Sequence, residues 1–309
     1  LRKLEEMEIR KEHTALSEEK ASLNELLGSE ELRWQMIAGQ ISDIRKAYGP
    51  KTELGARRTE IGTPPSDVVI PLEAMIEREP VTVLCSEKGW IRAARGHLQD
   101  TSDVRYKEGD GERFVLHAET TDKVLVFATD GRFYTIGADK LPGGRGFGEP
   151  LRLMFDLAQG HDIVSIFIFK PDRKLLVVSS DGRGFIVNER AVFAQTRAGK
   201  QVLNVSGDVE AKICTPVEGD TVAVVGENRK LLLFDISELP EMARGRGVLL
   251  QRYRDGGLAD AMIFEREKGL SWKSGERTRT ETDLREWIGK RAQAGRMPPK
   301  GFPRSNRFK

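Results

Sequence analysis

Residues that could carry out covalent chemistry are few in this chain and stand far apart. The two cysteines, Cys85 and Cys214, have no Cys or His near them at metal-ligand spacing, so neither a disulfide framework nor a structural zinc site is expected. The four histidines are scattered, and no HExxH, GxSxG or P-loop pattern occurs. The glycine run at 143–148 resembles a phosphate loop, but it opens no helix of a βαβ unit. The sequence therefore predicts a binding domain with no active site or cofactor of its own.

The feature that does recur is a loop that combines glycine with Arg or Lys, found at 95–97, 143–146, 195–201 and 243–247. Glycine lets a backbone N–H approach a phosphate closely, while Arg and Lys supply charge and hydrogen-bond donors. Cations at regular intervals match a phosphate backbone and can position a duplex without reading its bases. The alternative is a set of ordinary tight turns with solvated arginines. The predicted DNA-contacting residues are Arg95, Arg145, Gln195, Arg197, Gly199, Lys200, Arg244 and Arg246.

Charge is distributed unevenly along the chain. The 309 residues hold 50 Lys and Arg against 48 Asp and Glu, a formal net charge of +2. After Leu284, however, one acid, Glu286, faces eight cations: Arg285, Lys290, Arg291, Arg296, Lys300, Arg304, Arg307 and Lys309. A basic tail over 276–309 indicates either contact with a polyanion or a solvated, disordered end.

The N-terminal region predicts helix over 1–48, with a break at Gly28-Ser29. Glu, Lys, Leu and Arg dominate, and apolar residues recur at three- and four-residue steps. The narrow apolar stripe, which includes Leu16, Leu23, Ile37 and Ile41, is typical of a coiled-coil segment. No second helix of matching length follows it, so we expect its partner to lie in another chain or upstream. Gly49-Pro50 ends the helix, and a polar linker over 49–71 separates it from the next domain.

Beyond the linker, short β-branched runs repeat in pairs and predict hairpins. The pairs are 81–86 with 90–93, 124–129 with 132–136, 175–180 with 185–187, and 222–226 with 231–234. Asp-Gly turns join two of them, at 130–131 and 181–182, and we expect both central residues to have positive φ. A weaker fifth copy is predicted at 261–264 with 270–272. Such a period indicates a mainly β, propeller-like array of about five blades over 72–275.

The repeats and the loop at 195–201 resemble the C-terminal part of the A subunits of bacterial type IIA topoisomerases, on the ParC (topoisomerase IV) side. Gyrase A subunits carry the seven-residue box Gln-Arg-Arg-Gly-Gly-Lys-Gly. Gln195, Arg197, Gly199 and Lys200 match it, whereas Thr196, Ala198 and Gln201 depart. A degenerate box distinguishes topoisomerase IV from gyrase. The stretches 81–97 and 141–151 also resemble ParC blades, and 1–47 resembles the helix that returns from the C-gate.

The resemblance implies a β-pinwheel, a ring whose blades exchange strands, that binds and orients duplex DNA for decatenation and chromosome segregation. It also implies a ParE-type ATPase subunit, with a second A subunit, in an A2B2 heterotetramer, where ATP and Mg²⁺ are bound elsewhere. None of the four tyrosines has the context of the family's nucleophile, so we expect that residue upstream. The expected location is cytoplasmic and nucleoid-associated, with no membrane span, although the family includes peripheral membrane association. Gyrase-type DNA wrapping and a protein-interaction scaffold without DNA binding remain the alternatives.

Overall fold

The computed structural model describes residues 2–56, 77–144, 146–275 and 277–309. The chain forms two compact units, Leu1–Val69 and Ile70–Lys309, which are treated separately below. Most of the predicted linker, from residue 57 onward, lies outside the described residues. No helix in the described ranges is long and apolar enough to cross a membrane.

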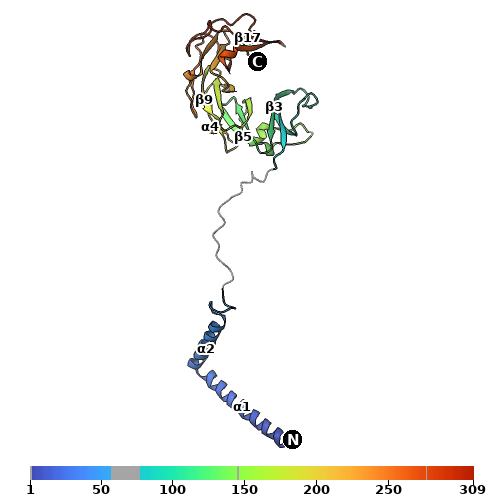
Figure 1. Ribbon diagram of the computed structural model, residues 1–309, viewed down its shortest axis with the longest axis vertical. Coiled ribbons are helices and arrows are strands. Elements are labelled where there is room, and N and C mark those ends of the chain that lie inside the picture. Colours follow the sequence, from blue (N-terminus) through green and yellow to red (C-terminus); the bar gives the residue numbers. More distant parts are fainter. Residues whose placement is uncertain (1, 57–76, 145, 276) are drawn as a thin grey trace. The chain divides into compact units, whose positions relative to one another are not determined.

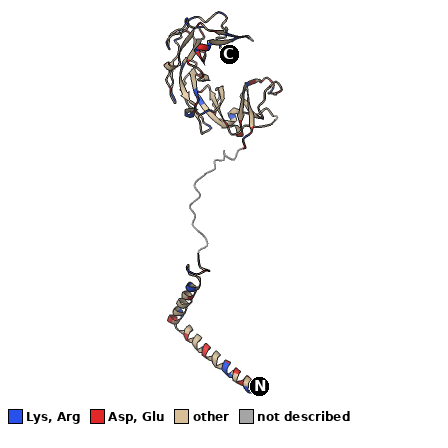
Figure 2. Cartoon of the chain, in the orientation of Figure 1, with Lys and Arg blue, Asp and Glu red and all other residues tan. Residues whose placement is uncertain are grey.

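The N-terminal unit contains two helices, α1 (Arg2–Gly28) and α2 (Glu30–Tyr48). They meet at the predicted break, where the Ser29 hydroxyl accepts the Leu32 N–H at 3.3 Å and caps α2. The apolar stripe is exposed, since Leu16, Leu23, Ile37 and Ile41 are each at least 42% accessible. Lys, Arg, Asp and Glu are interspersed along both helices (Figure 2). The prediction of helix with an uncovered stripe is confirmed for the described residues.

The second unit is built from short antiparallel strands arranged in successive sheets around a common centre (Figure 1). The strands are β1 (Pro80–Ser86), β2 (Trp90–Arg95), β3 (Glu112–Glu119), β4 (Lys123–Ala128), β5 (Arg132–Gly137), β6 (Glu149–Pro150), β7 (Ile163–Ile168), β8 (Lys174–Ser179), β9 (Arg183–Asn188), β10 (Lys200–Gln201), β11 (Ala211–Pro216), β12 (Thr221–Gly226), β13 (Leu231–Asp235), β14 (Val248–Leu249), β15 (Leu258–Phe264), β16 (Leu270–Ser274) and β17 (Arg277–Glu281). Two four-residue helices, α3 (Leu151–Met154) and α4 (Glu189–Val192), follow β6 and β9.

Each sheet combines strands from two successive repeats. The first three sheets have the orders β3-β1-β2-β6, β7-β4-β5-β10 and β11-β8-β9-β14, and the fourth has β15-β12-β13. In each of the first three sheets, the last strand follows the next hairpin in the sequence but pairs with the second strand of this sheet's own hairpin. The pairs are β6 with β2, β10 with β5 and β14 with β9. In the fourth sheet Arg296 takes this place, with backbone hydrogen bonds of 2.7 and 2.9 Å to Leu231. This strand exchange is the β-pinwheel arrangement, and the predicted fold class is confirmed.

Continuous apolar runs arise because each hairpin is covered on both faces. Val124 and Val126 pack with the first sheet, whereas Leu125 and Phe127 pack with the third. The predicted buried positions Val83, Leu125, Val177 and Val224 are all at most 1% accessible. Burying one such side chain stabilises the fold by about 1.5–3 kcal/mol, so the stacked sheets support one another.

The two Asp-Gly hairpins are confirmed, but their turn geometry differs from the prediction. Gly131 and Gly182 have φ of 75° and 77°, whereas neither aspartate has positive φ. The Gly131 N–H bonds to the Ala128 carbonyl at 2.9 Å, so the glycine is the fourth residue of its turn. The Asp130 carboxylate accepts the Arg132 N–H at 2.9 Å. These are turns with one left-handed glycine, and the aspartate stabilises the turn by hydrogen bonding.

The fifth repeat differs from the predicted hairpin. Residues 261–264 belong to β15, which pairs with β12 in the fourth sheet, and the fifth hairpin is β16 with β17. The apolar residues at 261–264 therefore correctly predict a strand, but the predicted pairing of that strand with 270–272 is wrong. β15 is apolar because it lines the third and fourth cores, where Leu258, Ala261, Ile263 and Phe264 are buried.

The segment predicted as a basic tail, 276–309, is part of the β unit rather than a separate end. Leu284, Trp287, Phe302 and Phe308 are buried in the fourth core beside Trp272. The Trp287 indole donates to the Met297 carbonyl at 2.7 Å, and the Lys273 N–H donates to the Phe308 carbonyl at 3.0 Å. These four buried apolar residues hold the segment against the fourth core. The prediction of a tail considered only the charged residues of the segment and so missed them.

Both thiols are buried, which predicts low reactivity. Burial raises the pKa of Cys85 to about 12 and raises that of Cys214 as well, so both remain protonated thiols near neutral pH. At about pH 8, we expect iodoacetamide to alkylate the native chain at least about 100-fold more slowly than the urea-unfolded chain, as followed by mass spectrometry. Labelling of either cysteine at equal rates in the two states would contradict this packing.

Candidate nucleic-acid interface

The exchanged strands lie at the outer margin of the sheets. The strands at the other end of each sheet, β3, β7, β11 and β15, contact one another in succession and therefore surround the centre. The segments that lead into β6, β10, β14 and Arg296 are accordingly rim loops, which we name exchange loops: 143–148, 195–199, 243–247 and 291–295. Three of the four Gly-Arg loops singled out from the sequence are brought to equivalent places in this way.

A glycine with positive φ ends each exchange loop. Gly148, Gly199, Gly247 and Gly295 have φ of 84°, 68°, 76° and 77°. A Cβ at these glycines would lie 2.2, 2.8, 2.5 and 2.5 Å from a carbonyl oxygen of the facing strand or its neighbour. Both the positive φ and the close approach make any residue with a Cβ unfavourable at these positions. The glycines are thus required by the strand exchange itself, whether or not a phosphate binds nearby.

The loop containing the degenerate box is held by the second sheet. The Gly199 N–H donates to the Thr196 carbonyl at 3.0 Å, and the Arg132 guanidinium donates to the Ala198 carbonyl at 2.9 Å. The Tyr134 ring lies under Gly199, and its hydroxyl donates to Asp130 at 2.8 Å. The pKa of Tyr134 is raised, mainly by burial and in addition by the neighbouring Asp130 carboxylate, so the hydroxyl stays protonated and remains a donor.

Within this loop the predicted contact residues have different roles. Gln195, Arg197 and Lys200 are exposed. The Arg197 guanidinium donates to the Leu153 carbonyl at 2.6 Å and lies 3.8 Å from Asp156, so it also holds the loop against α3 and the residues that follow it. The Lys200 side chain makes no hydrogen bond or ion pair with any other described residue and is fully available to a ligand.

The other predicted cations are likewise divided. Arg246 forms an ion pair with Asp181 at 3.1 Å, and Arg244 donates to the Asn204 side chain at 3.2 Å. Arg145 lies outside the described residues. Arg95 is exposed at the end of β2, but its loop precedes no exchanged strand. It therefore does not occupy the position equivalent to the other three loops.

Sequence reasoning missed the fourth exchange loop, because 291–296 was assigned to a basic tail. The loop ends in Ala294-Gly295-Arg296, which repeats the Ala198-Gly199-Lys200 pattern and could have revealed it. Arg296 is exposed, and its side chain makes no hydrogen bond or ion pair within the described ranges. Arg291 instead donates to the carbonyls of Glu238 and Leu249 at 3.2 and 2.8 Å and anchors the loop.

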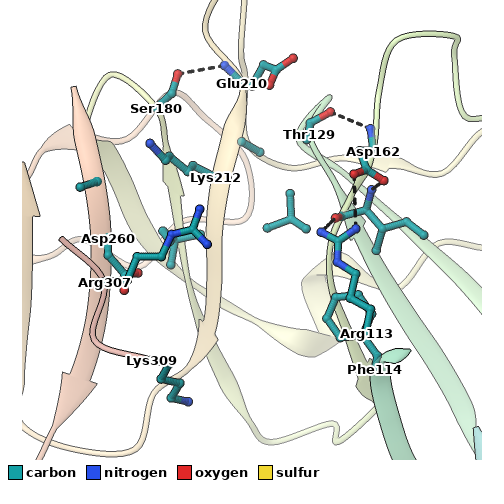
Figure 3. Close-up of a pocket in the computed structure, with 15 residues that line it drawn as sticks. Arg113, Phe114, Thr129, Asp162, Ser180, Glu210, Lys212, Asp260, Arg307 and Lys309 are labelled. Atoms are coloured by element: carbon teal, nitrogen blue, oxygen red, sulfur yellow. Dashed lines mark hydrogen bonds and ion pairs between the residues drawn. The ribbon is translucent and has the colours of Figure 1, made fainter. Parts of the chain in front are cut away.

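A cavity of about 800 Å³ lies between the inner strands at the centre (Figure 3). It is lined by both signs of charge, and several of its cations are already bonded. Arg113 donates to the Ile163 carbonyl at 2.6 Å and pairs with Asp162 at 3.3 Å, while Lys212 pairs with Glu227 at 3.5 Å. No group of three or more potential metal ligands exists among the described residues. Two further cations, Arg307 and Lys309, also line the cavity, so the centre combines cations with the carboxylates of Asp162, Glu210 and Asp260.

Gly199 provides a test of the loop geometry. Replacement by Ala would place Cβ 2.7 Å from the Tyr134 ring and force an unfavourable positive φ. We expect Gly199→Ala to lower the free energy of unfolding by about 1–3 kcal/mol, measured by urea denaturation. Gly146→Ala is the matched control, because nothing lies within 4 Å of its Cβ position. Equal stability of the two variants would contradict the described packing.

Comparison with known proteins agrees with this architecture. The family model described as the DNA gyrase C-terminal domain, beta-propeller, matches residues 122–170, 173–211 and 220–262. The whole chain is 45% identical to the A subunit of DNA topoisomerase 4 from Rickettsia bellii, and 45% identical to that from Caulobacter vibrioides, covering 42% of each relative. The solved C-terminal domain of E. coli ParC aligns with a TM-score of 0.65 and 27% identity, over 73% of this chain and 96% of that one.

The chain thus spans less than half the length of the curated relatives it matches. The similarity nevertheless includes both units, because it extends over all 309 residues of the chain. The fold, the strand exchange and the alignments agree: the chain belongs to the family of type IIA topoisomerase A subunits, and its β unit is the C-terminal β-pinwheel domain of that family.

Proposed function

We propose that the β unit binds duplex DNA along its rim and orients it for the strand passage of a topoisomerase IV-type enzyme. The observation that supports this most is the placement of exposed cations on successive exchange loops at the outer margin. Lys200 and Arg296 follow equivalent glycines and have no partner among the described residues, while Arg244 and Arg246 occupy the loop between them. Contacts of this kind attach a duplex through its phosphates and are independent of base sequence.

The same proposal covers the whole protein. The chain would act in an A2B2 assembly that holds two A subunits with two ParE-type ATPase subunits and is associated with the nucleoid. ATP and Mg²⁺ would be bound by other parts of that assembly, and the reaction would be the ATP-dependent passage of one duplex through another, with decatenation and relaxation. The basis is the similarity of the full chain to topoisomerase 4 A subunits.

Gyrase-type wrapping is the second candidate, because the exchange loops recur along the rim. Three departures disfavour it. Thr196 lacks the charge of the gyrase box, Ala198 replaces a glycine, and Gln201 donates its amide to the Asp130 and Leu203 carbonyls at 2.9 and 2.7 Å. A wrapping domain should leave positive supercoils in a nicked circle that is religated in its presence, and we expect none.

The rim proposal predicts a change in salt dependence. Replacing Lys200 and Arg296 together with Ala should weaken binding to unrelated duplexes by the same factor. The slope of log affinity against log salt should become shallower by about 0.9 for each phosphate that is no longer bound, up to about 1.8. Fluorescence anisotropy over a salt series measures this.

The matched control removes Lys170 and Arg254, which are exposed, lie outside the exchange loops and have side chains without a hydrogen bond or ion pair to any other described residue. Its slope should equal that of the native chain, and circular dichroism should show both variants folded. If the Lys200 and Arg296 variant kept the native slope, DNA binding by these loops would be refuted and the scaffold alternative favoured.

A further inference from the structure

One strand edge in the β unit lacks the partner that equivalent edges have. In the first four sheets, the second strand of the hairpin is bordered by its hairpin partner on one side and by the exchanged segment on the other. In the fifth sheet, β17 pairs with β16 alone among the described residues. The described part of the chain therefore contains four examples of how this edge is completed and one equivalent edge without a partner.

The open edge presents unpaired backbone groups. The Lys273 N–H donates to the Phe308 carbonyl, on the side of β16 that faces away from β17. Residues opposite each other in an antiparallel ladder alternate between hydrogen-bonded and non-bonded pairs, so Lys273 and Thr278 form a non-bonded pair. Thr278, and by the same alternation Thr280, must then direct their N–H and C=O groups toward the open edge.

The side chains at this edge define the charge of a suitable partner. Arg277, Thr278, Arg279 and Thr280 are all exposed. Arg279 lies against Gly301, where a Cβ would come within 2.2 Å of its Nη1, so its position is restrained. Two arginines two residues apart share one face of the strand and would lie opposite residues of an added strand. Antiparallel pairing with a second copy centred on Thr278 would place Arg277 opposite Arg279, which is unfavourable, whereas pairing centred on Thr280 would place Arg279 opposite Glu281. Self-association through this edge is therefore the competing outcome, and a dimer seen by sedimentation in the absence of peptide would overturn the proposal made below.

We propose that the open edge of β17 binds an extended, acidic segment of another protein, which adds to the fifth sheet as an exchanged strand. Thr278 and Thr280 supply the backbone hydrogen bonds, and Arg277 and Arg279 select acidic residues at alternate positions. Addition of a strand to a sheet edge is a general mode of peptide recognition. The proposal does not depend on DNA binding by the rim.

The test uses the full chain and a fluorescein-labelled peptide with alternating Glu and Val, read by fluorescence polarisation. Binding should saturate below about 1 mM peptide, and a peptide with Lys in place of Glu should not bind. Thr280→Pro removes an outward N–H and should weaken binding about tenfold. Thr280→Ala also loses the threonine hydroxyl but keeps the backbone N–H, so its affinity for the peptide should stay within about twofold of the native chain. A double variant, Arg277→Glu with Arg279→Glu, should reverse the preference and bind the Lys peptide.

A second measurement keeps the test valid if Thr280→Pro disturbs the hairpin. Methylation of the peptide's alternate backbone nitrogens preserves its charge and should abolish binding to the unmodified chain. If the methylated peptide or the Thr280→Pro variant bound as tightly as its control, the attraction would be charge alone, as with a phosphate backbone, and the proposal would be overturned. Failure of the unmodified peptide to bind would overturn it as well.

Discussion

The backbone pairing between the second strand of one hairpin and a segment from beyond the next hairpin underlies the rest of the structure. A two-stranded hairpin is marginal in water, and its open edge attracts further strands. Exchange completes each of the first four sheets and connects each to the next. It also requires a left-handed glycine where the segment enters, at Gly148, Gly199, Gly247 and Gly295. The loops that precede those glycines are consequently carried to the rim about every 50 residues along the chain.

The cations at these loops differ in what they do, which is how the proposed polyanion site is compatible with a net charge of only +2. Arg291 donates to the Leu249 carbonyl of β14, and Arg132 of β5 donates to the Ala198 carbonyl of an exchange loop, so both maintain the loop geometry. Arg246 is paired with a partly exposed aspartate, a contact that a phosphate could replace, because exposed ion pairs contribute little. Lys200 and Arg296 have no such partner in the described ranges. At the centre, by contrast, Arg113 and Lys212 are held by carbonyls and acids.

Much of the fold could be predicted from the sequence because hairpins are local. The runs around Val83, Leu125, Val177 and Val224 carry their own turn residues, and all four positions are buried. The partner of a strand is not a local property. Residues 261–264 were paired with their sequence neighbour instead of β12, and Arg296 was placed in a tail although it completes the fourth sheet. For the site, glycine and arginine spacing identified three exchange loops. The distinction between Arg197, which is bonded to Leu153, and Lys200, which has no partner in the described ranges, needed the packed structure.

Duplex DNA is proposed to lie on the exchange loops and not in the cavity between the inner strands. Amide hydrogen exchange with and without a duplex of arbitrary sequence tests this placement most directly, because it reports each segment separately. We predict added protection at 143–149, 195–201, 243–249 and 291–296, equal for unrelated duplexes and abolished at high salt. Protection confined to the inner strands around Arg113 and Lys212, or none in any exchange loop at a saturating duplex concentration, would contradict it.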